Sequence, residues 1–267
     1  LRYIDYSKRN HPSITYIING IFKNGLNYLI LLVFLIALGI GFTAEREGNN
    51  TLRLMNIQPI RSKEIYLGKL LAQVVVFISI ILLSLGIAFA GLLFSGKKIE
   101  SNYPVIHYEN KIDNDYEVDK LLRKNLAVNK GQDSIKIDDH KIFIGYRFRN
   151  MGKENMEMII IFIIIGIMSL AFSMLVSLGI KNRWLISIMT ILVFVLGYGF
   201  SMGILKGISL GLPFIWLNQA LVSSGEANII FDTNFINVKL GVAILALWIV
   251  ITVFLGVKKY NKKYGRG

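Results

Sequence analysis

The sequence predicts an all-α, polytopic membrane protein. Apolar residues make up 54% of its 267 residues and charged residues only 18%, whereas about a quarter of a soluble domain is charged. The charged residues are also clustered, because they gather at the ends of long apolar runs, as they do at membrane boundaries. These observations predict a multi-pass protein whose immediate surroundings are the lipid bilayer.

Five segments are long and apolar enough to cross the bilayer, since a helical span needs about 20 such residues. None of them contains Asp, Glu, His, Lys or Arg; they cover residues 25–44, 70–95, 158–180, 184–205 and 240–257. A sixth apolar stretch, 208–222, is shorter and contains Pro213, Asn218 and Gln219. It is expected to form an interfacial or re-entrant helix rather than a crossing.

The basic residues orient these spans, because short cytoplasmic loops are rich in Lys and Arg. The tail 258–267 has five basic residues and no acid, the link 181–183 has two, and segment 45–69 has five against three acids. Five crossings bring these three segments to one side, which we assign to the cytoplasm. Residues 1–24, 96–157 and 206–239 are then external.

The net charge of +13 is accounted for by these membrane flanks, so no nucleic-acid partner is expected. The segment 1–24 is an exception to the charge rule, since it carries Arg2, Lys8, Arg9 and Lys23. An additional span upstream of Leu1 would make that segment an ordinary external loop, and we expect one.

The external segment 96–157 has a different composition, with twelve Lys or Arg and eleven Asp or Glu. Its apolar pattern predicts a helix over 115–129. Alternation predicts a hairpin over 134–149 that turns at Asp138 and Asp139. The segment is therefore expected to be a small α+β insert, or alternatively a loop without regular structure.

Neither an enzyme nor a metal site is expected. The chain has no cysteine, and His11, His107 and His140 are too widely separated to show metal-ligand spacing. The predicted spans also lack the ionisable side chains that proton- and ion-coupled carriers place at membrane depth. Any energy for transport would have to be supplied by another subunit.

Two ladders of small residues recur every four positions, and so follow one face of a helix. One consists of Gly199, Gly203, Gly207 and Gly211, and the other of Ser169, Ser173 and Ser177. Helix packing explains both. The alternatives are a dimer seam along the glycines and a substrate path along the serines.

The segment 45–69 joins the first two predicted spans and has a distinct local pattern. Thr51 can cap a short helix that carries Leu52 and Met55, and Pro59 ends it because the residue before a proline avoids the α region. The result is a short helix on the inner membrane face, preceded by Glu45 and Glu47.

This segment resembles the coupling segment of type-2 ABC transporter permeases, the membrane subunits of bacterial exporters of drugs, peptides, antibiotics and polysaccharides. The matching residues are Glu45, Glu47, Gly48, Thr51, Leu52, Leu54, Pro59, Ile60, Arg61, Gly68 and Lys69. The layout of spans and the basic tail are also similar. The family has six spans, so the resemblance implies a first span upstream of Leu1, and the insert 96–157 is larger than usual.

The resemblance implies a permease subunit in a bacterial cell membrane, paired with a second permease subunit, identical or different. It also implies cytosolic ATPase subunits, which would bind ATP and Mg²⁺ and contact the interface residues Glu45, Glu47, Gly48, Thr51, Leu52, Met55, Pro59, Arg61, Gly68 and Lys69. The uncharged spans suit an amphipathic or hydrophobic cargo, such as a peptide, antibiotic or drug. The alternative is a receptor or sensor that does not transport and binds a ligand through the insert.

Overall fold

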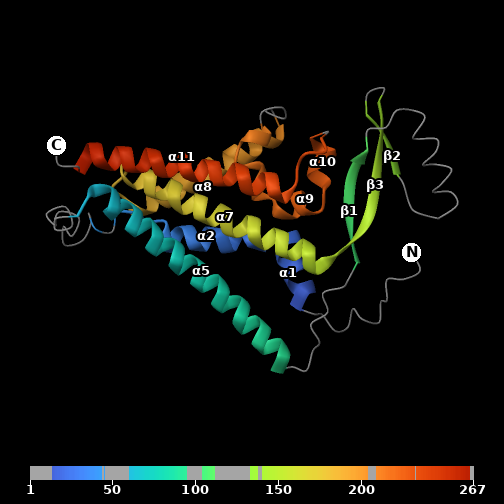
Figure 1. Ribbon diagram of the computed structural model, residues 1–267, viewed down its shortest axis with the longest axis horizontal. Helices are drawn as coiled ribbons and strands as arrows, with labels where there is room; N and C mark the ends of the chain where they lie inside the picture. Colours follow the sequence, from blue (N-terminus) through green and yellow to red (C-terminus); the bar gives the residue numbers. More distant parts are fainter. Residues whose placement is uncertain are drawn as a thin grey trace.

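A computed structural model describes residues 14–43, 45, 60–94, 104–111, 133–137, 140–203, 209–231 and 233–264. Long helices form a bundle, and a small sheet lies beyond one of its ends (Figure 1). The elements are α1 (Ile14–Lys23), α2 (Leu26–Leu38), α5 (Ser62–Phe94), β1 (Pro104–Lys111), β2 (Asp133–Ile137), β3 (His140–Asn150), α7 (Met151–Ser177), α8 (Arg183–Gly203), η2 (Ser209–Gly211), η3 (Ile215–Leu217), α9 (Gln219–Ser223), α10 (Glu226–Ile230) and α11 (Val238–Tyr264).

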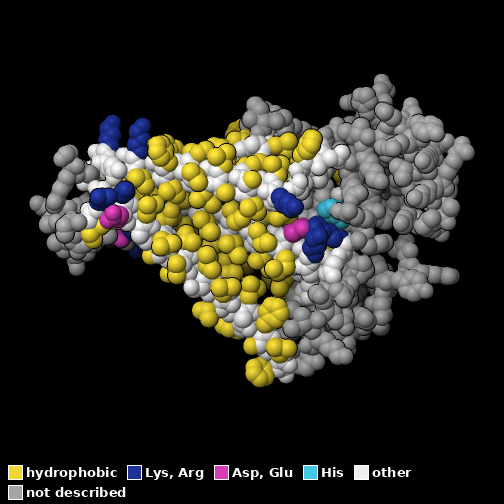
Figure 2. Space-filling view, in the orientation of Figure 1, with side chains coloured by type: hydrophobic (Ala, Val, Ile, Leu, Met, Phe, Trp, Pro, Cys, Tyr) yellow, Lys and Arg dark blue, Asp and Glu magenta, His cyan; other side chains and the backbone are white. Residues whose placement is uncertain are grey.

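Four helices are long and apolar enough to cross a membrane: α5, α7, α8 and α11. A fifth span results if α1 and α2, which meet at 78°, count as one broken span. Apolar side chains cover the middle of the bundle, and basic and acidic side chains lie toward its two ends (Figure 2). The helices are thus compatible with a multi-pass membrane protein, as the sequence predicts.

The first predicted span, 25–44, differs in the structure, because its helix α2 is only 13 residues long. Gly25 and Gly41 have φ angles of 76° and 57°, in the left-handed region that interrupts an α-helix and that glycine adopts at little cost. A separate helix, α1, also lies within the segment that was expected to be a simple external loop. The chain therefore bends between α1 and α2 at Gly25, and Gly41 lies just beyond the end of α2.

Helix α7 is the centre of the bundle and packs against α1, α2, α5, α8, α9 and α11. Met158, Ile161 and Ile165 are fully buried along it, and Phe162 packs edge-on against Phe22 of α1. Helix α5, by contrast, diverges from the bundle toward its C-terminal end (Figure 1), and none of its described side chains is buried beyond Ile81. Burial thus distinguishes a central span from a peripheral one.

The sheet is antiparallel with strand order β1-β3-β2. In the register of β2 and β3, Ile137 is opposite His140, at the residues for which the hairpin was expected. The helix expected over 115–129 lies outside the described residues. Strand β1, which the sequence analysis did not anticipate, is attached to the bundle by a 2.7 Å hydrogen bond from the Tyr108 amide to the Ser224 carbonyl.

Within the stretch expected to form an interfacial or re-entrant helix, the described residues 209–222 form a series of short helices. Elements η2, η3 and α9 follow one another, with Asn218 capping α9 through the Leu221 amide. Trp216 is fully buried and lies where a Cβ on Gly241 would come within 2.5 Å of its ring. The chain therefore folds against α11 instead of crossing beside it.

Candidate functional site

The segment that resembles a coupling element is visible at its two flanks. Of its predicted interface residues, Glu45, Arg61, Gly68 and Lys69 are described; Glu47, Gly48, Thr51, Leu52, Met55 and Pro59 lie outside the described residues. Lys69 forms an ion pair with Glu45. This pair places Glu45, just beyond α2, beside Lys69 near the start of α5.

The same end of the bundle carries the other two basic segments. The C-terminal end of α11 lies beside the α7–α8 turn, since Lys263 donates a 2.7 Å hydrogen bond to the Leu178 carbonyl. The start of α5 lies at that end too (Figure 1). Lys258, Lys259 and Lys262 are exposed there. The described parts of the three segments that charge assigns to one side therefore lie at the same end of the bundle.

The serine ladder is inside the helix packing. Ser169, Ser173 and Ser177 are fully buried, and each hydroxyl donates to a carbonyl of its own helix at 2.7 to 2.8 Å. Ser177 also accepts a 3.1 Å hydrogen bond from the Phe42 amide. Within this chain, the hydroxyls serve α7 and its junction with the end of α2.

The glycine ladder has the opposite surroundings. A Cβ built on Gly199, Gly203 or Gly211 would meet no atom within 4 Å, and Gly207 lies outside the described residues. Side chains at these three positions would therefore meet open space among the described residues. The close contacts involve other glycines that no regular spacing marks, among them Gly166 against Phe77 and Gly256 against Tyr66.

A cavity of about 400 Å³ opens between α2 and α8 and extends to the end of η3. Its walls are apolar, and polar groups come from Tyr28, Tyr198 and Asn218; the apolar lining is Leu31, Leu32, Leu35, Ile191, Phe194, Val195 and Leu217. Asn218 donates a 3.3 Å hydrogen bond to the Tyr198 hydroxyl. An apolar cavity of this size with a few uncharged polar groups is suited to a hydrophobic or amphipathic molecule.

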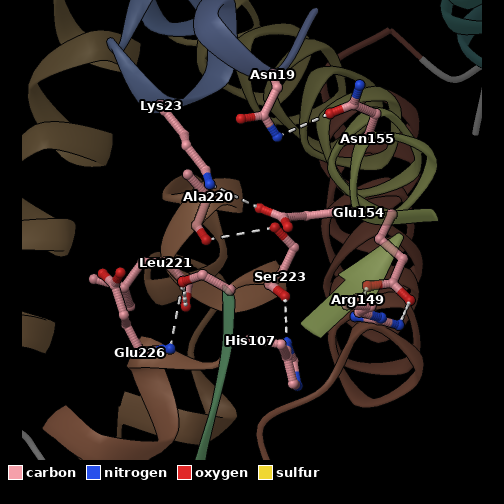
Figure 3. A network of polar contacts seen from close by, with 12 residues as sticks. Asn19, Lys23, His107, Arg149, Glu154, Asn155, Ala220, Leu221, Ser223 and Glu226 are labelled. Atoms are coloured by element: carbon pink, nitrogen blue, oxygen red, sulfur yellow. Dashed lines mark hydrogen bonds and ion pairs between the residues drawn. The ribbon is translucent and has the colours of Figure 1, made fainter. Parts of the chain in front are cut away.

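A polar clamp, formed by Asn19, Lys23, Glu154 and Asn155, holds α1 against the start of α7 (Figure 3). The fully buried Glu154 lies 3.3 Å from Lys23, Asn19 donates to Asn155 at 3.1 Å, and Asn155 donates to the Thr15 carbonyl at 2.6 Å. The Lys23 ammonium compensates the charge of the buried Glu154 carboxylate, because an unpaired buried charge is costly. The sequence offered no signal for this clamp, because its two halves are far apart in the chain.

Next to the clamp, the sheet is joined to the short helices. The His107 ring contacts the Ser223 carbonyl through Nδ1 at 3.0 Å, and Arg149 forms a bidentate pair with Glu157. Figure 3 shows these contacts beside the Lys23–Glu154 pair. Within the described part of the chain, no three His, Asp or Glu side chains are grouped so that they could hold a metal ion.

Comparison with known proteins does not extend these observations. No protein-family model, curated protein or solved structure matches the chain.

Proposed function

We propose that this chain is the permease subunit of an ATP-driven exporter. The observation that carries the proposal is the segment 45–69, whose residues resemble a type-2 coupling segment and whose ends are joined by the Glu45–Lys69 ion pair. Cytosolic ATPase subunits would bind ATP and Mg²⁺ and contact helix 52–58. The chain itself would carry out no catalysis and would act with a second permease subunit in a bacterial cell membrane.

The geometry of the bundle supports this proposal in two ways. The Glu45–Lys69 pair lies at the same end as the C-terminal end of α11 and the α7–α8 turn, which is the arrangement that a cytoplasmic docking face requires. The cavity between α2 and α8 is uncharged and fits an amphipathic or hydrophobic cargo, such as a peptide or antibiotic. Transport would need two arrangements of these helices, between which ATP binding shifts the balance.

The decisive experiment is copurification with the ATPase, followed by ATPase and transport assays in proteoliposomes. In the Leu52→Asp, Met55→Asp variant, two apolar anchors of the interface become charged, and such anchors tend to dominate binding energy. We expect the ATPase to dissociate, or transport to stop, while the permease still inserts. The Asn49→Asp, Asn50→Asp variant adds the same charge outside helix 52–58 and should retain its partner.

If the Leu52→Asp, Met55→Asp variant binds its ATPase and transports like the parent, the segment is not a coupling element. Orientation is tested separately in the cysteine-free chain, with single cysteines and a membrane-impermeant thiol reagent on intact cells. We expect labelling at position 125 and none at position 262. The reverse pattern would contradict the proposed sidedness.

A further inference from the structure

Four helix ends meet around one aromatic side chain. Phe42, just beyond α2, is fully buried, with its ring centroid 5.8 Å from that of Tyr66 on α5 and 4.9 Å from that of Tyr260 on α11. The Phe42 amide donates to Ser177 at the end of α7, and the Lys69 ammonium lies 4.7 Å from the Phe42 ring centroid. This aromatic joint therefore connects α2, α5, α7 and α11.

The contact between α5 and α11 depends on a glycine. A Cβ on Gly256 would overlap the Tyr66 hydroxyl and ring, so only glycine allows the Tyr66 side chain to reach the backbone of α11. The Tyr66 hydroxyl is buried and has no hydrogen-bond partner among the described residues. Because it makes no bond there, its role in this contact is to fill the notch that Gly256 leaves.

The position of this contact connects it to the proposed coupling segment. Tyr66 and Lys69 are one turn apart at the start of α5, and Lys69 forms the ion pair with Glu45. The ring of Tyr260 is 6.0 Å from that of Tyr66. A force applied to the coupling segment would therefore reach α5 beside Tyr66, where α5 packs on α11.

We propose that Tyr66 and Gly256 are positioning residues that make the start of α5 and the end of α11 move as one unit. A push on the coupling segment would then tilt the last span together with α5. This inference rests on the proposed function for its role in transport, but the mechanical link between the two helices is a property of the chain alone.

The link is tested by distance measurements between spin labels in the full-length, cysteine-free chain in lipid nanodiscs. Cysteines at the exposed positions Lys63 and Lys262 report on α5 against α11, and a cysteine at Arg183 provides a reference on α8. We expect a single narrow Lys63–Lys262 distribution in the parent. Gly256→Ala should broaden or shift it, because the new methyl group displaces Tyr66.

Gly86→Ala is the control. Gly86 lies on α5, the helix that carries Tyr66, and a Cβ there would meet nothing within 4 Å, so this variant should leave the distribution unchanged. Tyr66→Phe removes only the hydroxyl, which is the Tyr66 atom that lies deepest in the notch, and adds no clash. It should therefore broaden the distribution even if Gly256→Ala fails to fold. Identical distributions in Tyr66→Phe and Gly86→Ala would overturn the proposal.

The complex with the ATPase then tests the transport role. On adding a non-hydrolysable ATP analogue, the Lys63–Lys262 distance should stay constant while the distances from both labels to Arg183 change. In Tyr66→Phe, ATP hydrolysis should continue while transport per ATP falls several-fold. A changing Lys63–Lys262 distance in the parent would refute the link between α5 and α11, as would unaltered transport per ATP in the variant. If the parent chain binds no ATPase at all, the proposed function is refuted instead.

Discussion

The two ends of the bundle are held together by different chemistry. At one end the aromatic joint packs Phe42, Tyr66 and Tyr260, and rings attract one another over a range of orientations. At the other end the polar clamp buries Glu154 and Asn155, whose contacts depend strongly on geometry. The first end is thus held by the fit of packed side chains, such as Tyr66 against Gly256, whereas the second end holds α1 through a buried charge and hydrogen bonds.

The largest effect is expected from breaking the clamp. Lys23→Met would leave the fully buried Glu154 carboxylate without its counter-charge, which typically costs at least 3 kcal/mol; the exposure of Lys23 reduces this to about 2–3 kcal/mol. Reversible unfolding in detergent would measure the loss. Lys153→Met is the control, because Lys153 is exposed, and it should change stability by less than about 0.5 kcal/mol.

An effect of equal size from the two lysine variants would show that the buried pair does not hold α1. A Lys23→Met, Glu154→Leu double variant sharpens the test, because removing both charges should restore much of the stability that the single change removes.

A smaller loss, about 2 kcal/mol, is expected for Gly41→Ala at the joint. The positive φ of 57° costs an L-residue about 1–2 kcal/mol, and the new methyl group would overlap Ser177. The same unfolding assay applies, with Gly199→Ala as the control in open space. A Gly41→Ala variant as stable as the parent would mean that the exit from α2 is not constrained as the structure shows.

The stability of Tyr66→Phe, a change at the aromatic joint, can be compared directly with that of Lys23→Met, a change at the polar clamp. Tyr66→Phe removes a hydroxyl that makes no described hydrogen bond, so the free energy of unfolding should change by less than about 1 kcal/mol. Unfolding curves measured beside those of Lys23→Met should therefore separate the two clearly. A loss as large as that of Lys23→Met would end the distinction between a joint held by packing and a clamp held by a buried charge.

Gly203→Leu is expected to have the smallest effect on the fold, because a Cβ there meets nothing within 4 Å. The monomer should unfold like the parent. Size-exclusion chromatography with light scattering then tests assembly: loss of the dimer would identify the glycine face as a dimer seam, and an unchanged dimer would place that face toward lipid.

Spans and loops could be predicted because each depends on a contiguous run of residues. The apolar runs around Ile161 and Leu245 are visible in the sequence itself, and the alternation over 134–149 marked two strands. The clamp could not be predicted, since Asn19 and Asn155 are neighbours only after α1 has folded back at Gly25. Likewise, regular spacing drew attention to Gly203, while the irregularly placed Gly256 makes the close contact.

The sequence by itself determined that the chain has several helices long and apolar enough to span a membrane, and where most of them lie, because a run of about 20 apolar residues is a local property. It also supplied the segment 45–69, on which the proposed function depends. Only the tertiary structure decided the bend between α1 and α2, the partner of Glu154, and the meeting of four helix ends at Phe42. These features arise from the packing of distant helices, which no single stretch of the chain encodes.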